Sequence, residues 1–268
     1  MLRFTKMNGA GNDFVLIDNR SEALELSRRQ IAFLCDRHRG VGADGVLLVE
    51  PPEGGGDFRM RYYNSDGGEA EMCGNGARCF SRFANKIAGP FSQVCFETQA
   101  GMIRADIDGD QVRLGMSKPH GLALNRSLDV GGVKLSTHFV NTGVPHVVTF
   151  VDDIESVPVQ QWGSEIRHHP AFRPSGTNAN FVKEIEPGKL IIRTYERGVE
   201  AETLACGTGV TAAGLIYAAL SNVPSPVHLQ VRGGDWLEVG FRASGNDFED
   251  VTLMGPADFT FEGSITIS

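Results

Sequence analysis

Cys73-Gly74-Asn75-Gly76 returns 133 residues later as Cys206-Gly207-Thr208-Gly209, and this repeated stretch is the strongest pointer to the fold. Other matches share the offset to within one residue: Gly11 to Val15 with Gly143 to Val147, Arg61 to Asn64 with Arg193 to Glu196, and Gly101 with Gly234. Separate matches at a shared offset indicate an internal duplication rather than chance. We therefore predict two copies of one α/β unit, each carrying a Cys-Gly-x-Gly.

Apolar and polar residues alternate in segments of both halves, which predicts strands bounded by Gly, Asn and Asp. These segments are Phe58 to Tyr63, Val112 to Met116, Leu190 to Tyr195 and Leu237 to Phe241. Ser27 to His38 is predicted to be a helix, because Ser27 suits the N-cap, Gln30 completes a capping box and Gly40 follows the end. The chain is therefore expected to mix α and β structure.

Helical patterns follow both cysteines. After Cys73, apolar residues recur at helical spacing as far as Gly89-Pro90, and Val210 to Leu220 is apolar or small nearly all round. A helix that is apolar on every side must be buried. We expect each Cys-Gly-x-Gly to open a central helix wrapped by strands, with the cysteine at its N-terminus.

Charge and hydropathy exclude several classes of partner. The formal net charge of -8 without a basic run argues against nucleic acid and anionic membranes. No segment approaches the roughly 18 apolar residues of a membrane span, and the opening MLRFTKMNGAGNDF lacks the apolar stretch of a signal peptide. We expect a cytosolic protein that acts on a small molecule.

The five cysteines (35, 73, 79, 95 and 206) have no Cys-x-x-Cys spacing, so they form a poor disulfide framework and a poor zinc site. A helix N-terminus favours the thiolate, so Cys73 and Cys206 are two poised bases. If the halves face each other, one thiolate could remove the α-proton of an amino acid while the opposite thiol delivers a proton to the other face. This would invert the α-carbon without a redox change.

Two other interpretations of the cysteines stay open. A single Cys before a helix is more often a small buried residue, as we expect for Cys35, Cys79 and Cys95. Cys73 and Cys206 could also form a redox pair.

At these residues the chain resembles the diaminopimelate epimerase family. The resemblance covers nearly the whole chain and rests on Met7 to Phe14, Asn64 to Cys79 (NSDGGEAEMCGNGARC) and Glu196 to Gly209 (ERGVEAETLACGTG). It implies interconversion of LL- and meso-diaminopimelate, for lysine and peptidoglycan precursors, by a homodimer. It also implies an α+β fold of two pseudo-symmetric halves, each a strongly curved, mostly antiparallel sheet or barrel around a central helix. The halves would be 1–117, completed by 257–268, and 118–256, with the active site in the cleft between them.

The resemblance also assigns roles to residues. Cys73 and Cys206 match the two catalytic bases, with His146 and Glu196 assisting thiol ionisation and proton handling. The residues expected to bind substrate are Gly74, Asn75, Gly207 and Thr208 at the reacting carboxylate, Asn12 near it, and Asn64, Asn178, Glu196 and Arg197 at the distal end. Arg197 could bind a distal carboxylate bidentately. Taken singly, His146 would more often be structural, Arg197 a solvated charge and the three asparagines turn residues.

Two positions depart from the family pattern: Gly45 stands where many members have Gln, and Val144 where many have Asn. Gly40 to Gly45 matches a dinucleotide-binding pattern by letter, but it follows a helix and precedes the strand Val46 to Val49, which is the wrong context. His168-His169 is expected to be a polar loop rather than a metal site. We expect neither a cofactor nor a metal.

Rival functions remain at this point. One is another two-cysteine racemase, such as a proline racemase or 4-hydroxyproline epimerase, although those enzymes usually have His where this chain has Asn75. The others are a fold relative without the thiol pair, acting as a binding module or through a carboxylate base, and a thiol-redox protein.

Overall fold

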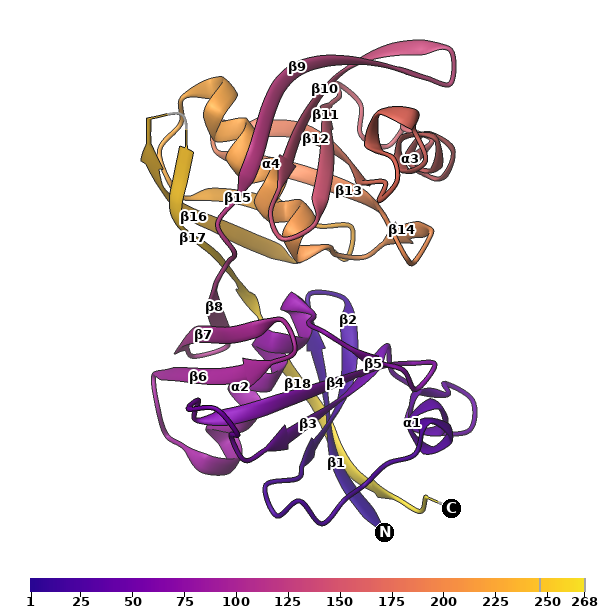
Figure 1. The fold of residues 1–268 in the computed structure, drawn as a ribbon, viewed down its shortest axis with the longest axis vertical. Coiled ribbons are helices and arrows are strands. Elements are labelled where there is room, and N and C mark those ends of the chain that lie inside the picture. Colours follow the sequence, from indigo (N-terminus) through magenta and orange to yellow (C-terminus); the bar gives the residue numbers. More distant parts are fainter. Residues whose placement is uncertain (246, 268) are drawn as a thin grey trace. The chain divides into compact units, whose positions relative to one another are not determined.

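The structure is a computed structural model that describes residues 1–245 and 247–267. The chain divides into two compact units (Figure 1). Unit 1 comprises Met1–Leu114 and Gly255–Ser268, and unit 2 comprises Gly115–Met254. The C-terminal segment thus returns to the N-terminal unit.

Unit 1 contains one mixed sheet and two helices. Its strands are β1 (Leu2–Gly9), β2 (Asn12–Asp18), β3 (Gly45–Glu50), β4 (Phe58–Asn64), β5 (Glu69–Ala70), β6 (Gln93–Thr98), β7 (Gly101–Asp108), β8 (Gln111–Gly115) and β18 (Asp258–Ile265). They pair in the order β18-β1-β2-β3-β4-β6-β7-β8, with β5 on β4, and neighbours are antiparallel except at β2–β3 and β4–β6. The helices are α1 (Arg28–Cys35) and α2 (Gly74–Ala88).

The two helices of unit 1 cover opposite faces of this sheet. Ile31 and Leu34 of α1 pack with Val15, Val46 and Leu48, the alternate residues on one face. Helix α2 contacts β1, β2, β3, β4 and β7, and these strands extend across most of the strand order, so the sheet curves around the helix. Helix α2 is therefore the central helix of unit 1.

Unit 2 repeats the same plan with its own strands and two α-helices. The strands are β9 (His120–Val130), β10 (Val133–Asn141), β11 (Pro145–Phe150), β12 (Asn178–Glu186), β13 (Lys189–Glu196), β14 (Ala201–Thr203), β15 (Val227–Gln230), β16 (Trp236–Ser244) and β17 (Asp247–Pro256). They pair as β9-β10-β11-β12-β13-β15-β16-β17, with β14 on β13, and are parallel at β11–β12 and β13–β15. The helices are α3 (Val159–Arg167), the short 3-10 helix η1 (Pro170–Phe172) and α4 (Gly207–Ser221).

The sequence of pairings in unit 2 matches that in unit 1 strand for strand, including both parallel steps, which agrees with the internal repeat in the sequence. Helix α4 contacts strands from β10 to β16 and is buried from Gly209 to Ala218, as its apolar sequence predicts. Gly214 lets it approach β16 closely, because a Cβ there would lie 3.0 Å from Val239.

Local sequence expectations are confirmed with two adjustments. The capping box of α1 is present, with Gln30 accepting from the Ser27 N–H, but the helix ends at Cys35 rather than His38. It ends early because the Asp36 carboxylate accepts from the N–H groups of His38 and Arg39, which forms a turn. Helix α3 was not predicted from the sequence. Among the described residues, no helix combines the length and apolar character needed to cross a bilayer.

Candidate active site

Cys73 is the N-cap of α2. Its backbone is extended (φ -138°, ψ 120°), its carbonyl accepts from the Ala77 N–H at 2.8 Å, and its side chain is half-buried. A Cβ on the neighbouring Gly74 would meet nothing within 4 Å, so space is open beside the first turn. A helix N-terminus presents N–H groups that have no acceptor within the helix, which suits an anion. The Cys73 thiol thus stands beside a potential carboxylate cradle.

A directed chain of hydrogen bonds holds Asn75 and Asn12. The fully buried Arg78 guanidinium donates to Asn75 Oδ1 at 2.8 Å, Asn75 Nδ2 donates to Asn12 Oδ1 at 2.6 Å, and Asn12 Nδ2 donates to Asp44 Oδ2 at 2.9 Å. Gly9 lies against this chain, because a Cβ there would lie 2.6 Å from the Asn75 carbonyl oxygen. Each amide is therefore oriented by its neighbours.

The outer end of this chain is anchored by charge. Burial favours the neutral Asp13 carboxyl, but hydrogen bonds from Arg37 and Lys6 outweigh this and lower its pKa to about 2. Arg37 donates to both Asp13 oxygens, at 2.8 and 2.9 Å, and to Asp44 at 2.9 Å. Asp44 is thereby held where it accepts from Asn12.

Asn64 and Gly45 face each other at the end of β4 and the start of β3. Asn64 is exposed and closes a turn with Gly67 and Gly68. A Cβ on Gly45 would lie 2.5 Å from the Tyr63 carbonyl oxygen and 2.6 Å from the Tyr62 ring. The Tyr62 ring therefore occupies the space that a longer side chain at position 45 would need.

Cys206 is the N-cap of α4 and corresponds to Cys73. Its backbone is extended (φ -126°, ψ 103°), its carbonyl accepts from the Val210 N–H at 2.9 Å, and its Sγ lies 3.5 Å from Thr208 Oγ1. The buried Thr142 hydroxyl donates to the Thr208 carbonyl at 2.9 Å, which ties the β10–β11 turn containing Val144 to the start of α4.

His146 lies in the interior beside this helix start. Burial, with a smaller contribution from the positive charge of Arg197, lowers the pKa of the fully buried His146 to about 3, so the ring is neutral at pH 7. A Cβ on Gly209 would lie 3.4 Å from both His146 Cε1 and Cys206 Sγ, and it would overlap Asn180 Oδ1. The ring, the thiol and the Asn180 amide thus border one small space.

Asn178, Glu196 and Arg197 lie together where β12 begins and β13 ends. The buried Asn178 accepts from the Arg197 N–H at 2.7 Å and donates to the Pro145 carbonyl at 3.2 Å. Arg197 donates to the Ser175 carbonyl at 3.1 Å. Burial raises the pKa of Glu196, with the Thr203 hydroxyl acting in the opposite direction, so its carboxyl is a better proton acceptor than an exposed one.

Successive side chains of a strand point to opposite faces of the sheet, and this alternation explains why the polar side chains of β11, β12 and β13 share one face. Val147, Ala179, Phe181 and Tyr195 pack in the cluster with α3. The alternate residues His146, Asn178, Asn180, Thr194 and Glu196 therefore belong to the opposite face, which α4 covers. Two polar side chains of this face, His146 and Asn180, lie against Gly209 at the start of α4.

Two other cysteines are chemically quiet. Cys35 and Cys79 are buried free thiols, and burial raises the pKa of each to about 12. Neither serves as a base near pH 7, so the structure assigns both to the core.

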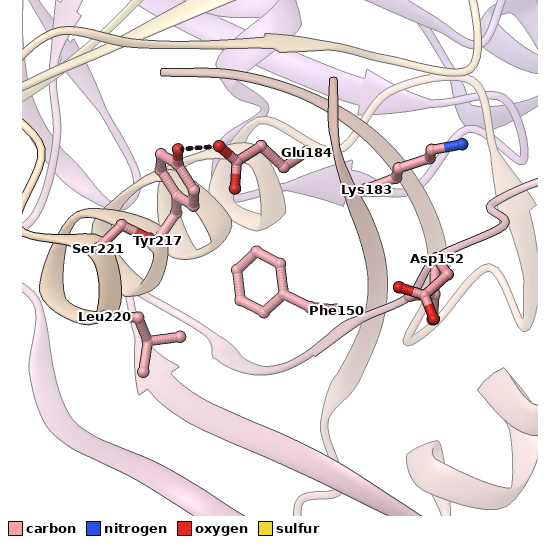
Figure 2. A pocket seen from close by; sticks show the side chains of 8 residues that line it. Phe150, Asp152, Lys183, Glu184, Tyr217, Leu220 and Ser221 are labelled. Atoms are coloured by element: carbon pink, nitrogen blue, oxygen red, sulfur yellow. Dashed lines mark hydrogen bonds between the residues drawn. The ribbon is translucent and has the colours of Figure 1, made fainter. Parts of the chain in front are cut away.

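A hollow of about 500 Å³ also lies in unit 2, lined by Phe150, Asp152, Lys183, Glu184, Tyr217 and Leu220 among others (Figure 2). Tyr217 donates to Glu184 at 2.8 Å across one side of it. It lies at the C-terminal end of α4, about 15–20 Å along the helix from Cys206 at a rise of 1.5 Å per residue. We therefore do not assign it to the candidate active site.

The structure thus groups the predicted residues within each unit. Asn12, Asn64, Cys73, Gly74 and Asn75 belong to unit 1, and His146, Asn178, Glu196, Arg197, Cys206, Gly207 and Thr208 belong to unit 2. Three further residues hold these side chains and were not predicted from the sequence: Arg78, Asp44 and Asn180. The alternation in Asn178-Ala179-Asn180-Phe181 was a signal for Asn180. His168 is the C-cap of α3 and His169 is the N-cap of η1, and no group of metal-ligating side chains occurs among the described residues.

Solved structures share this fold at low sequence identity. A Bacillus anthracis phenazine biosynthesis protein of the PhzF family superposes with a TM-score of 0.73 at 14% identity, covering 99% of each chain. A hydroxyproline epimerase from Agrobacterium vitis gives a TM-score of 0.66 at 16% identity, covering 98% of this chain and 90% of its own. The predicted α+β fold is confirmed.

Sequence comparison identifies the family. A diaminopimelate epimerase from Aquifex aeolicus is 42% identical and covers 99% of this chain and 98% of its own length. One from Chlorobaculum tepidum is 41% identical, covering 97% and 100%. The family model "Diaminopimelate epimerase" matches residues 4–120 and 138–260. The resemblance predicted from the cysteine motifs is thereby confirmed, and the chain belongs to the diaminopimelate epimerase family.

Proposed function

We propose that this protein interconverts LL- and meso-diaminopimelate without a cofactor, using Cys73 and Cys206 as its two bases, for lysine and peptidoglycan precursor synthesis. The observation that carries the proposal is that each unit places a Cys-Gly-x-Gly cysteine as the N-cap of its central helix. The substrate is proposed from the names of the relatives, which are diaminopimelate epimerases, and the reaction is proposed from the two thiols, one in each unit.

In the proposed reaction, the thiolate of one cysteine takes the α-proton and the C–H electron pair remains on the α-carbon, delocalised into the carboxylate. The thiol of the other cysteine then gives its proton to the opposite face. One proton leaves, one arrives and no redox change occurs. The carbanion-like charge needs preorganised donors, and the helix N-termini at Gly74–Asn75 and Gly207–Thr208 supply N–H groups for the reacting carboxylate.

The remaining site residues are proposed to hold the distal end of the substrate and to handle protons. Asn64, Asn178 and Arg197 offer amide and guanidinium groups that fit a second amino and carboxyl group. Glu196, with its raised pKa, suits proton exchange with a thiol or binding of the distal ammonium. Asn12, oriented by Asn75 and Asp44, is proposed to contact substrate near the reacting centre.

A substrate comparison tests the proposal. Reduced protein is incubated with LL-diaminopimelate, L-proline and trans-4-hydroxy-L-proline, and stereoisomers are separated by chiral chromatography. We expect inversion of diaminopimelate at a rate at least about 100-fold above the others, because binding of the distal groups contributes to transition-state stabilisation. Faster inversion of L-proline or trans-4-hydroxy-L-proline would favour the second candidate function, which is proline racemase or 4-hydroxyproline epimerase activity. That candidate is considered because a solved hydroxyproline epimerase has the same fold.

We also propose a homodimer that forms through β18. Phe259 and Phe261 are 36% and 48% exposed on this strand, and the Arg82 and Lys86 cations lie 5.0 and 4.6 Å from the Phe259 ring centre. Large exposed aromatics on one strand favour a protein interface. In sedimentation experiments, Phe261→Glu should yield monomer while Met102→Glu, at another exposed apolar site, should not. Dimer in both variants would contradict this interface.

The proposed chemistry requires reduced thiols, so we propose a cytoplasmic location. The free thiols Cys35, Cys79 and Cys95 are consistent with a reducing compartment. Fractionation of source cells should recover the epimerase activity with cytoplasmic markers, and recovery with an extracytoplasmic fraction would contradict the location.

A further inference from the structure

We propose that Asn180 is a positioning residue that fixes His146 as its Nε2–H tautomer, so that His146 acts on the reacting groups as a hydrogen-bond donor and not as a base. This inference rests on the proposed function for its catalytic consequence, while the tautomer itself is a property of the protein alone.

The orientation of the Asn180 amide is set by two contacts. Its Nδ2 lies 2.8 Å from the Val147 carbonyl oxygen, and its Oδ1 accepts from the Thr194 hydroxyl at 3.0 Å. A carbonyl oxygen can only accept, so the amide nitrogen must face Val147. The reversed amide would place two acceptors against each other inside the core, where an unmet hydrogen bond costs most.

The same amide nitrogen lies 3.2 Å from His146 Nδ1. Because an amide nitrogen only donates, Nδ1 must be the unprotonated, accepting nitrogen of the ring. Burial keeps the ring neutral at pH 7, with a pKa of about 3, so its single proton is on Nε2. Three buried side chains, Thr194, Asn180 and His146, thus form one directed relay.

His146 Nε2 is buried, and among the residues that the structure describes no group accepts a hydrogen bond from it. A buried donor without an acceptor points to an acceptor that arrives with the reacting state. The ring and Cys206 Sγ border the space beside Gly209. The acceptor that we infer is therefore a substrate oxygen, or the Cys206 thiolate when it forms in the reaction. Donation to a thiolate favours ionisation of the thiol, whereas the basic nitrogen of the ring is occupied by Asn180.

The tautomer can be read directly. Protein labelled with ¹⁵N-histidine is examined at pH 7 by long-range ¹H–¹⁵N correlation, and the signals of His146 are assigned by their loss in His146→Gln. We expect the unprotonated nitrogen of His146 to couple strongly to Hε1 alone, which identifies it as Nδ1. Strong coupling of that nitrogen to both Hε1 and Hδ2, or a doubly protonated ring, would overturn the proposal.

Variants separate positioning from general stability. In Asn180→Asp a carboxylate faces Nδ1, so the proton should move to Nδ1 and kcat should fall roughly 10²-fold with KM little changed. Thr149→Val changes another buried residue of β11, the strand of His146, but on the opposite face of that strand, and should leave tautomer and kcat unaltered. An Asn180→Asp protein with unchanged kcat would contradict the catalytic role. If Asn180→Asp does not fold, the tautomer measured in the wild-type protein still tests the proposal about Asn180. Wild-type protein that has the expected tautomer but no epimerase activity would refute only the proposed function.

Discussion

The third position of each central helix offers a paired test of the candidate site, because both positions are glycine but their surroundings differ. A Cβ on Gly76 would lie 3.5 Å from Cys73 Cβ, Leu47 and Phe14, which is ordinary contact. A Cβ on Gly209 would overlap Asn180 Oδ1. Gly76→Ala and Gly209→Ala therefore add the same methyl group, at one position with room for it and at one position without room.

The expected changes in the free energy of unfolding have opposite signs. Replacing helical Gly by Ala stabilises by up to about 1 kcal/mol, which should appear for Gly76→Ala. In Gly209→Ala the Asn180 amide must move, which disturbs its contacts with Val147, His146 and Thr194. At about 0.5–1.5 kcal/mol for each hydrogen bond, the loss is about 2–4 kcal/mol, so the net change is a destabilisation of about 1–3 kcal/mol.

Urea unfolding followed by circular dichroism measures both variants. Gly76→Ala should have an unchanged or higher midpoint, and Gly209→Ala a lower midpoint together with a loss of epimerase activity of at least roughly 10-fold, because the surroundings of Cys206 shift. Equal changes in stability for the two variants, or a stabilised Gly209→Ala, would refute the packing described around Asn180.

Three further predictions follow from buried groups. The folded pKa of His146, about 3, is below its ordinary value of 6.5, so its contribution to stability is complete above pH 6.5 and is lost as the pH falls. The free energy of unfolding should decrease by about 2 kcal/mol between pH 6.5 and 5, and His146→Phe should lack this decrease. Equal pH slopes for both proteins would contradict the assignment. Arg78→Met should destabilise by about 3 kcal/mol, since Asn75 Oδ1 and the Gly9 and Pro256 carbonyls lose their donor, whereas half-buried Arg82→Met should cost under about 1 kcal/mol in the same denaturant titration. Cys35 and Cys79, with pKa values near 12, should react with iodoacetamide at pH 8 at least roughly 100-fold more slowly in folded than in urea-unfolded protein, and peptide mass spectrometry that found equal rates would disprove their burial.

Much of the architecture was predictable because local sequence patterns determine it. The repeated cysteine motif predicted two equivalent units, and the all-apolar run after Cys206 predicted a buried central helix, as α4 is. The capping-box residues of α1 predicted its start correctly. Its end was wrong by three residues because the Asp36 turn competes with the helix, and such competition is weakly encoded in single residues.

The supporting residues of the candidate site were harder to predict because their roles arise from tertiary contacts. Arg78 reads as a surface charge on a helix, yet it is fully buried and directs Asn75 from one turn away. Asp44 belongs to a glycine-rich loop and binds Asn12, which is 32 positions distant. Only the folded chain brings such residues together.

The central claim is that two thiols act on opposite faces of one α-carbon. It is tested most directly by incubating wild-type protein, Cys73→Ser and Cys206→Ser with LL-diaminopimelate in deuterated water, and following the α-proton signal and the meso isomer by NMR. The two-thiol mechanism predicts deuterium incorporation with inversion in the wild type, and loss of inversion by at least roughly 10³-fold in each variant. Inversion at near wild-type rate in either folded variant, or inversion without deuterium in the product, would contradict it.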